Sequence, residues 1–173
     1  MPCRRDQLLV LGFSIVVANL AGCASVVPAQ LKERVRSVSF TKLQQAPDTY
    51  AGTLVLLGGE VLVVKPRGEG MEIEVLERPL GFRDRPRRDR PPRGRFAVLL
   101  RPQEGDEQID KLGPGRLVTV VGEVQGSTTS SSDVPPYNFP LLVARHLHVW
   151  PQPVFSGGPE IGFKIRVQES IGF

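Results

Sequence analysis

The sequence predicts a mainly β fold, most simply a small five-stranded OB-like barrel with one short helix; a β-sandwich is the alternative. Three observations carry this prediction. Apolar, β-branched runs of strand length recur along the chain. The 18 glycines and 16 prolines fall between these runs as turn residues instead of forming one low-complexity block. Glycines also interrupt two of the runs, as the bent strands of a small barrel require.

One helix and five strands can be placed in order along the chain. The helix is expected over residues 39–46, with Ser39 or Thr41 as its N-cap and Pro47 after its end. The first strand is expected to bulge or bend sharply at Gly58-Gly59. The second strand shows the clearest alternation of apolar and charged residues. The five strands are expected over residues 52–65, 71–75, 95–101, 117–124 and 141–150.

The N-terminus has the pattern of a bacterial lipoprotein signal. Arg4 and Arg5 precede an apolar run over residues 8–20, which is shorter than the about 20 residues that a membrane-spanning helix needs. The run ends in a sequence that resembles a lipobox, formed by Leu20, Ala21, Gly22 and Cys23. We therefore predict a signal peptide over residues 1–22 and a lipid on the Cys23 thiol. An ordinary signal peptide with a chance cysteine is the alternative.

The remainder divides into three segments. Residues 23–37 are expected to be a lipidated tether, residues 38–151 the β domain, and residues 152–173 a C-terminal tail. Ala24 and Ser25 follow the cysteine, where an aspartate would resemble the retention signal of inner-membrane lipoproteins. This resemblance implies the outer membrane.

The two cysteines and the net charge limit the kinds of site that the mature domain can contain. Cys3 leaves with the predicted signal and Cys23 carries the lipid, so the mature domain has no thiol for a disulfide, a nucleophile or a thiolate metal site. No metal site and no cofactor are predicted. The net charge of +4 is mild and does not by itself indicate a nucleic-acid partner.

Several ordered blocks resemble the Slp family of outer-membrane lipoproteins, the starvation-inducible type. The most specific block covers residues 115–122, and the others cover 47–52, 57–59, 74–80, 94–96, 136–141 and 147–151. The resemblance implies an outer-membrane lipoprotein linked to starvation or stress, without an established enzymatic activity or cofactor. The chain departs from the family in an arginine-rich stretch before Gly94 and in its tail.

That stretch is the main candidate binding site. Its prolines keep it extended, and Asp84 and Asp89 are its only acids. Arginine binds phosphate and carboxylate with a bidentate fork, and each basic residue near an anionic surface contributes about 1 kcal/mol. We predict an anion-binding loop for lipid phosphate, lipopolysaccharide or an acidic polymer; a solvated surface loop is the alternative. The arginines are Arg83, Arg85, Arg87, Arg88, Arg90, Arg93 and Arg95.

Other candidates have simpler interpretations. His146 and His148 lie two residues apart and share one face of the predicted strand, as in a two-histidine metal half-site. The favoured interpretation is that they are simply two polar residues beside Trp150. Glu72 and Glu74 could serve as acid and base, but their alternation places them on the solvent side of their strand. Residues 127–132 are expected to form a flexible loop between the last two strands.

We therefore predict a non-enzymatic outer-membrane lipoprotein for envelope maintenance or a starvation or stress response, which binds an anionic envelope component or an envelope protein. An envelope hydrolase acting on lipid or glycan, and a structural subunit of an envelope assembly, are the alternatives. Nucleic acid is not an expected partner, because the few aromatic residues lie among apolar neighbours.

Overall fold

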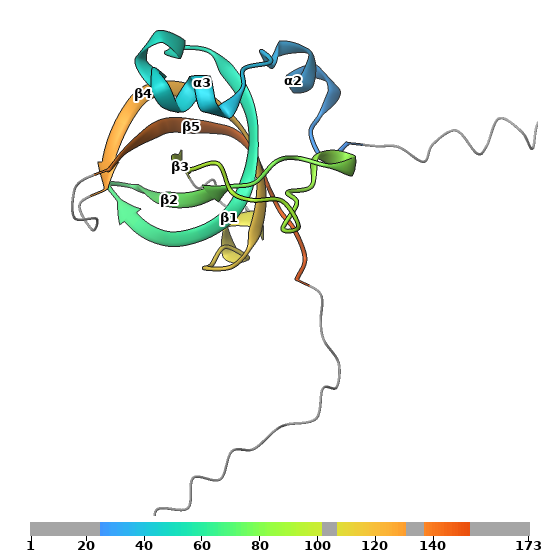
Figure 1. Cartoon of the computed structure of the whole chain (residues 1–173). Coiled ribbons are helices and arrows are strands. Elements are labelled where there is room, and N and C mark those ends of the chain that lie inside the picture. The colour runs from blue at the N-terminus through green and yellow to red at the C-terminus, as the bar shows by residue number, and fades with distance from the viewer. Residues whose placement is uncertain (1–24, 102–106, 131–136, 153–173) are drawn as a thin grey trace, which may run out of the picture.

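The computed structural model describes residues 25–101, 107–130 and 137–152, and its five strands close into one barrel (Figure 1). The strands are β1 (Leu54–Arg67), β2 (Gly70–Glu77), β3 (Arg95–Leu100), β4 (Leu117–Ser130) and β5 (Tyr137–Val149). Around the barrel their order is β1, β2, β3, β5, β4, and β4 pairs back onto β1. All neighbours are antiparallel except β3 and β5. The predicted mainly β, five-stranded OB-like barrel is confirmed.

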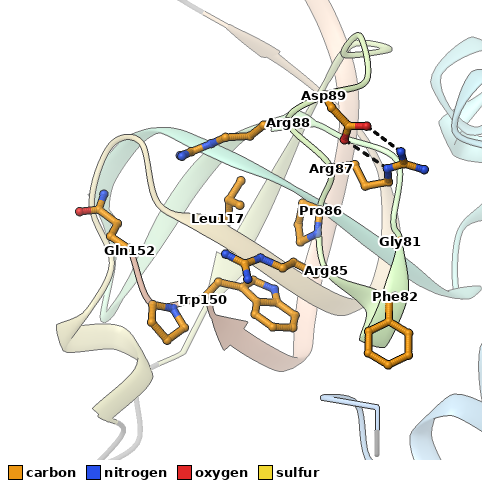
Figure 2. A pocket seen from close by; sticks show the side chains of 11 residues that line it. Gly81, Phe82, Arg85, Pro86, Arg87, Arg88, Asp89, Leu117, Trp150 and Gln152 are labelled. Atoms are coloured by element: carbon orange, nitrogen blue, oxygen red, sulfur yellow. Dashed lines mark hydrogen bonds and ion pairs between the residues drawn. The ribbon is translucent and has the colours of Figure 1, made fainter. Parts of the chain in front are cut away.

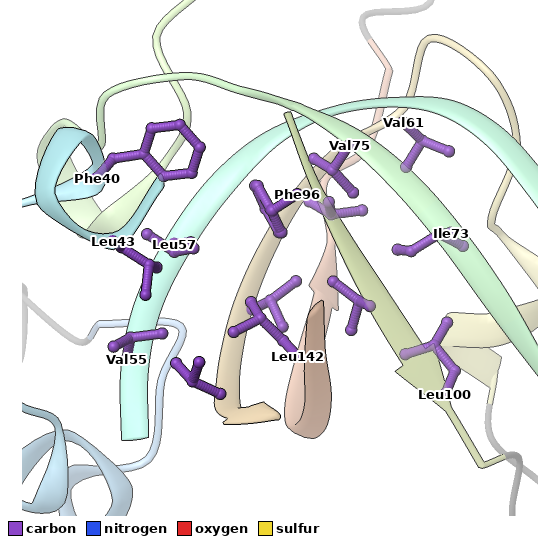
Figure 3. Packing of buried hydrophobic residues seen from close by; sticks show 14 of the residues in the cluster. Phe40, Leu43, Val55, Leu57, Val61, Ile73, Val75, Phe96, Leu100 and Leu142 are labelled. Carbon is purple, nitrogen blue, oxygen red and sulfur yellow. The ribbon is translucent and has the colours of Figure 1, made fainter. Parts of the chain in front are cut away.

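The barrel interior is packed with the inward-facing residues of every strand. On β2, Ile73 and Val75 are completely buried, as are Phe96 and Val98 on the neighbouring β3. Figure 3 shows Ile73, Val75 and Phe96 among side chains of β1 and β5 that belong to the same core cluster. Alternation along each strand places such residues on one face, which explains why the strands could be found from the sequence.

The predicted short helix is also confirmed. Helix α3 (Phe40–Gln45) begins after Ser39, whose hydroxyl oxygen accepts a hydrogen bond from the Lys42 amide at 3.4 Å. The helix lies across one end of the barrel (Figure 1), where its Phe40 and Leu43 are buried in the core. Phe40 meets Phe96 edge to face, with 6.2 Å between ring centroids.

Strands β4 and β5 are longer than predicted. Residues 127–130, expected in a loop, belong to β4 and pair with residues 137–140 of β5. The expectation for residues 131 and 132 lies outside the described residues. Pro140 was expected to precede the last strand but lies within it. Since β3 pairs with β5 only from Leu141 onward, Pro140 has a ladder partner only in β4, as on a sheet edge where proline is tolerated.

The glycine pair in β1 has a different role from the predicted bulge. Pairing with β4 runs regularly through Gly58 and Gly59, and the register shift with β2 lies between Val61 and Val63. A Cβ on Gly58 would lie 2.3 Å from the side chain of Leu80, and one on Gly59 would lie 2.2 Å from a backbone oxygen of β2. The glycines therefore allow close approach of neighbouring segments.

Within the described ranges, four short helical segments accompany the predicted one. They are α2 (Ala29–Arg34), η1 (Pro47–Tyr50), η2 (Phe82–Asp84) and α4 (Glu107–Asp110). Helix α2 lies within the predicted tether, where Val27 is buried and the Arg36 amide donates to the Leu54 carbonyl at 2.8 Å. In the described ranges, no helix has the length and apolarity needed to cross a bilayer.

Candidate functional site

The connection between β2 and β3, residues 78–94, folds back against the outside of the barrel. Leu80 and Pro86 form an isolated antiparallel bridge, and the Arg87 amide donates to the Pro79 carbonyl at 3.0 Å. Pro86 is buried over Gly58, whose missing side chain leaves the room that this contact needs. The arginine-rich stretch is therefore held against β1 by a local turn and one close glycine contact.

This connection forms one side of a hollow of about 700 Å³, which we call the arginine hollow (Figure 2). Leu117 at the start of β4 and Trp150 after the end of β5 provide its apolar wall. Its charged lining consists of three arginines and one aspartate, which leaves an excess of positive charge. The full lining is Gly81, Phe82, Arg85, Pro86, Arg87, Arg88, Asp89, Leu117, Trp150, Pro151 and Gln152.

The tryptophan in this wall is fixed from both sides. The guanidinium of Arg85 lies over the Trp150 ring, 5.2 Å from its centroid. The indole Nε1 donates to the Thr119 hydroxyl at 2.9 Å, and this hydroxyl donates to the Asp84 carbonyl at 2.7 Å. Thr119 is completely buried. The chain of hydrogen bonds therefore sets the position of Trp150 relative to the arginine-rich connection.

Two further arginines are held at the rim by contacts that leave them exposed. Arg87 donates to both carboxylate oxygens of Asp89, at 3.2 and 2.6 Å. This hydrogen bond raises the pKa of Arg87 and lowers the pKa of Asp89. Arg88 donates to the Gly115 carbonyl at 2.5 Å and lies 3.4 Å from the Glu60 carboxylate. The Arg87 and Arg88 side chains keep 42% and 46% of their surface exposed, so an incoming anion can reach them.

The structure separates the remaining arginines of the stretch from this group. Arg93 donates to both carboxylate oxygens of Glu77, which is buried at the end of β2. Arg90 lies 4.0 Å from Asp89. Arg95 begins β3, and the Arg83 guanidinium lies 5.5 Å from the centroid of the Phe82 ring. Only Arg85, Arg87 and Arg88 line the arginine hollow.

Sequence reasoning missed two aromatic members of this site. Phe82 is 75% exposed and projects from the connection at the edge of the hollow (Figure 2). Trp150 comes from the far end of the chain, and its pairing with Arg85 depends on how the connection folds back. The signal available was that Trp150 is the only tryptophan of the chain.

The two histidines of the predicted pair contact different groups, and neither lines the hollow. His146 Nε2 lies 3.0 Å from the Val26 carbonyl, and the His148 ring packs edge to face on Trp150 with centroids 4.7 Å apart. Burial, helped by the charges of His146 and Lys111, lowers the pKa of His148. Across the residues described, no group of three or more metal-ligating side chains comes together.

Of the two β2 glutamates that were expected to face solvent, Glu72 is partly exposed and Glu74 is buried. Glu74 is buried with 5% exposure, and its carboxylate accepts a hydrogen bond from Lys65 on β1 at 2.6 Å. Glu72 is partly exposed and pairs with Arg67. The prediction that Glu74 faces solvent is therefore wrong. The Lys65 ammonium pairs with the Glu74 carboxylate and so makes its burial possible, which the alternation in the sequence does not reveal.

Comparisons with known proteins give one family and two distant structures. A family model described as the outer membrane lipoprotein Slp family matches residues 20–159. No curated protein matches. A putative aspartyl-tRNA synthetase from Leishmania major Friedlin is similar with 13% identity and a TM-score of 0.41, covering 80% of this chain. The chain spans 26% of that synthetase. Schizosaccharomyces pombe Pot1pC bound to ssDNA is similar with 12% identity and a TM-score of 0.32, covering 60% of this chain and 83% of its own.

Proposed function

Because the chain belongs to the Slp family of outer membrane lipoproteins, we propose that it is a lipid-anchored module whose barrel binds an anionic envelope component in the arginine hollow. The family match confirms the predicted family and an outer-membrane location. The lipobox residues lie outside the described residues, so lipidation at Cys23 belongs to the proposal. The match begins at Leu20, the first residue of the predicted lipobox, which supports this assignment.

The observation that carries the binding proposal is the pairing of an apolar wall with exposed guanidinium groups. Arg87 and Arg88 stand at the rim, while Trp150 and Leu117 form the wall behind them. Guanidinium groups bind phosphate in a bidentate manner, and an aromatic wall accepts acyl or other apolar groups. The hollow therefore suits an amphiphile with a phosphate group, such as a phospholipid or a lipopolysaccharide fragment.

The predicted role in the envelope and the predicted division of the chain also remain proposals. A non-enzymatic role in envelope maintenance or in a starvation or stress response follows from the family resemblance and adds no site of its own. The division into a signal peptide (1–22), a tether (23–37), a barrel domain (38–151) and a tail (152–173) also remains our proposal. For the tether, the burial of Val27 and the hydrogen bond from the Arg36 amide to the Leu54 carbonyl of β1 support a docked segment.

A titration tests the binding proposal. The full-length lipoprotein would be kept in nonionic detergent micelles and titrated with short-chain phosphatidic acid, with phosphatidylcholine of the same chain length as the uncharged comparison. Trp150, the only tryptophan, reports occupancy of the hollow by its fluorescence. We expect saturable binding of the phosphatidic acid and much weaker binding of the phosphatidylcholine.

Variants make this test specific to the rim arginines. Arg87→Gln with Arg88→Gln removes two positive charges worth about 1 kcal/mol each, so the Kd should rise about 30-fold. Lys42→Gln with Arg101→Gln is the control with the same change in net charge, because both residues are exposed and neither lines the hollow. Equal weakening by both variants, or none by the rim variant, would show that the hollow does not bind the anion.

A further inference from the structure

The segment that follows the predicted lipid anchor is fastened to the connection that bears the arginine hollow. The Ser25 hydroxyl donates to the Asp84 carboxylate, and the Lys32 ammonium donates to both oxygens of that carboxylate, at 3.0 and 2.8 Å. The Ser25 hydroxyl also accepts from the Val27 amide at 3.0 Å. The Asp84 side chain is only 14% exposed. We call these three residues, Ser25, Lys32 and Asp84, the clasp.

Further contacts hold the same segment to the barrel. Val27 is 3% exposed, and the Val26 carbonyl meets His146 of β5 at 3.0 Å. Residues 25–27 therefore lie on the barrel surface and do not hold it at a distance. In Figure 1 the segment leading into α2 lies beside η2, which contains Asp84.

The clasp limits how far the barrel can stand from the membrane. Ser25 follows Cys23 by two residues, and a fully extended chain spans at most about 3.6 Å per residue. The Cα of a lipidated Cys23 would thus lie within about 7 Å of the Cα of Ser25. With Cys23 anchored in this way, the contact between Ser25 and Asp84 would place the neighbouring residues of η2 near the membrane surface.

Those neighbouring residues have the composition of a membrane-contacting surface. Phe82 is the most exposed large apolar side chain of the described residues, at 75%. Arg83 and Arg85 flank Asp84, and the other rim arginines follow directly in the chain. An exposed aromatic ring surrounded by basic side chains is suited to the interface, where the ring enters the acyl boundary and the cations meet phosphate groups.

The backbone at this point is also unusual. Arg83 and Asp84 both have positive φ, at 56° and 61°, a left-handed conformation that residues other than glycine seldom adopt. The clasp and the hydrogen bond from Thr119 to the Asp84 carbonyl hold this turn in place. The turn directs Phe82 outward, away from Trp150 in the wall of the hollow (Figure 2).

We propose that the clasp orients the barrel so that η2 and the rim of the arginine hollow lie on the lipid surface to which Cys23 is anchored, with Phe82 inserted and the arginines on lipid phosphate groups. This inference rests on the proposed function, because it names membrane phospholipid as the source of the anion. It adds an orientation: the barrel lies on its η2 side and is not free to tumble on its anchor.

The experiment places a fluorophore at Phe82. With Cys3 removed and Cys23 lipidated, Phe82→Cys supplies the only thiol for an environment-sensitive label. Tyr137→Cys is the matched control, because Tyr137 is the other exposed large apolar side chain in the part of the chain that the structure describes. Tyr137 begins β5, whereas Trp150 in the wall of the hollow follows the end of that strand. Each labelled full-length lipoprotein is reconstituted through its own anchor into phosphatidylcholine vesicles with or without phosphatidylglycerol, and with or without brominated acyl chains.

We expect a blue shift and loss of emission by brominated chains at position 82 and not at position 137, strongest with phosphatidylglycerol. Asp84→Asn with Ser25→Ala, which opens the clasp, should reduce the quenching at position 82. Equal quenching at both positions, or none at either, would overturn the orientation. If the hollow still binds phosphatidic acid in micelles under that outcome, the proposed function stands and only the docking on the membrane is rejected.

Discussion

Replacing Arg93 would test whether one arginine of the basic stretch stabilises the fold. Its guanidinium donates from Nε to Glu77 at 3.0 Å and from Nη2 to the other carboxylate oxygen. The Glu77 side chain is 2% exposed and that of Arg93 is 42% exposed. This hydrogen bond raises the pKa of Arg93. Arg93→Met keeps most of the aliphatic stem and leaves a buried carboxylate without its partner.

The expected cost follows from these exposures. Removing one partner of a fully buried ion pair costs about 3–5 kcal/mol. Since Arg93 is partly exposed, water can replace some of the lost contact, so we expect about 2–3 kcal/mol. Replacing both partners, as in Glu77→Leu with Arg93→Met, should recover most of this loss because no charge remains buried.

Urea unfolding of the full-length lipoprotein in nonionic micelles, followed by circular dichroism, measures the free energy of unfolding. Arg90→Met is the matched control, because its guanidinium lies 4.0 Å from an exposed aspartate. Its effect should stay within about 0.5 kcal/mol. The reasoning is refuted if Arg93→Met costs no more than Arg90→Met, or if the double replacement is less stable than Arg93→Met alone.

Two further predictions concern the core and pH. Phe40→Ala removes a ring that is 1% exposed and packs against Phe96, so it should cost about 3–5 kcal/mol in the same unfolding assay; a loss below about 1 kcal/mol would contradict the placement of α3 in the core. Burial lowers the pKa of His148, so the unfolded chain takes up a proton more readily than the fold. Stability should therefore fall as the pH drops below about 6.5, and His148→Gln should weaken this dependence; an identical pH profile for the variant would contradict it.

The strands could be predicted from the sequence because their signal is local. The alternation around Ile73 and Val75 marks one buried face, and Ser39 marks the start of α3 by a cap that acts within three residues. The lengths of β4 and β5 were less predictable. The extra residues of β4 are mostly polar, and those of β5 include Pro140, so neither extension has the apolar alternation of a strand. The two extensions are ordered by pairing with each other, which composition does not reveal.

The candidate site could be predicted only in part, for a related reason. The arginines are adjacent in sequence, so their concentration was visible. The different partners of these arginines were not visible in the sequence. Arg93 pairs with Glu77, and Arg85 stacks on Trp150, only because residues 78–94 fold back over Gly58. Burial of Glu74 likewise depends on Lys65 from another strand.

The strand order has a consequence for how the protein reaches its folded state. β5 pairs with both β3 and β4, and β4 pairs with β1, so residues from distant parts of the chain must meet before the ring closes. Such long-range pairing slows folding. A chain delivered N-terminus first would expose the unpaired edge of β3 until residues 141–143 of β5 had emerged. In the crowded envelope, the interval before β5 arrives is therefore when this protein is most open to wrong strand pairing.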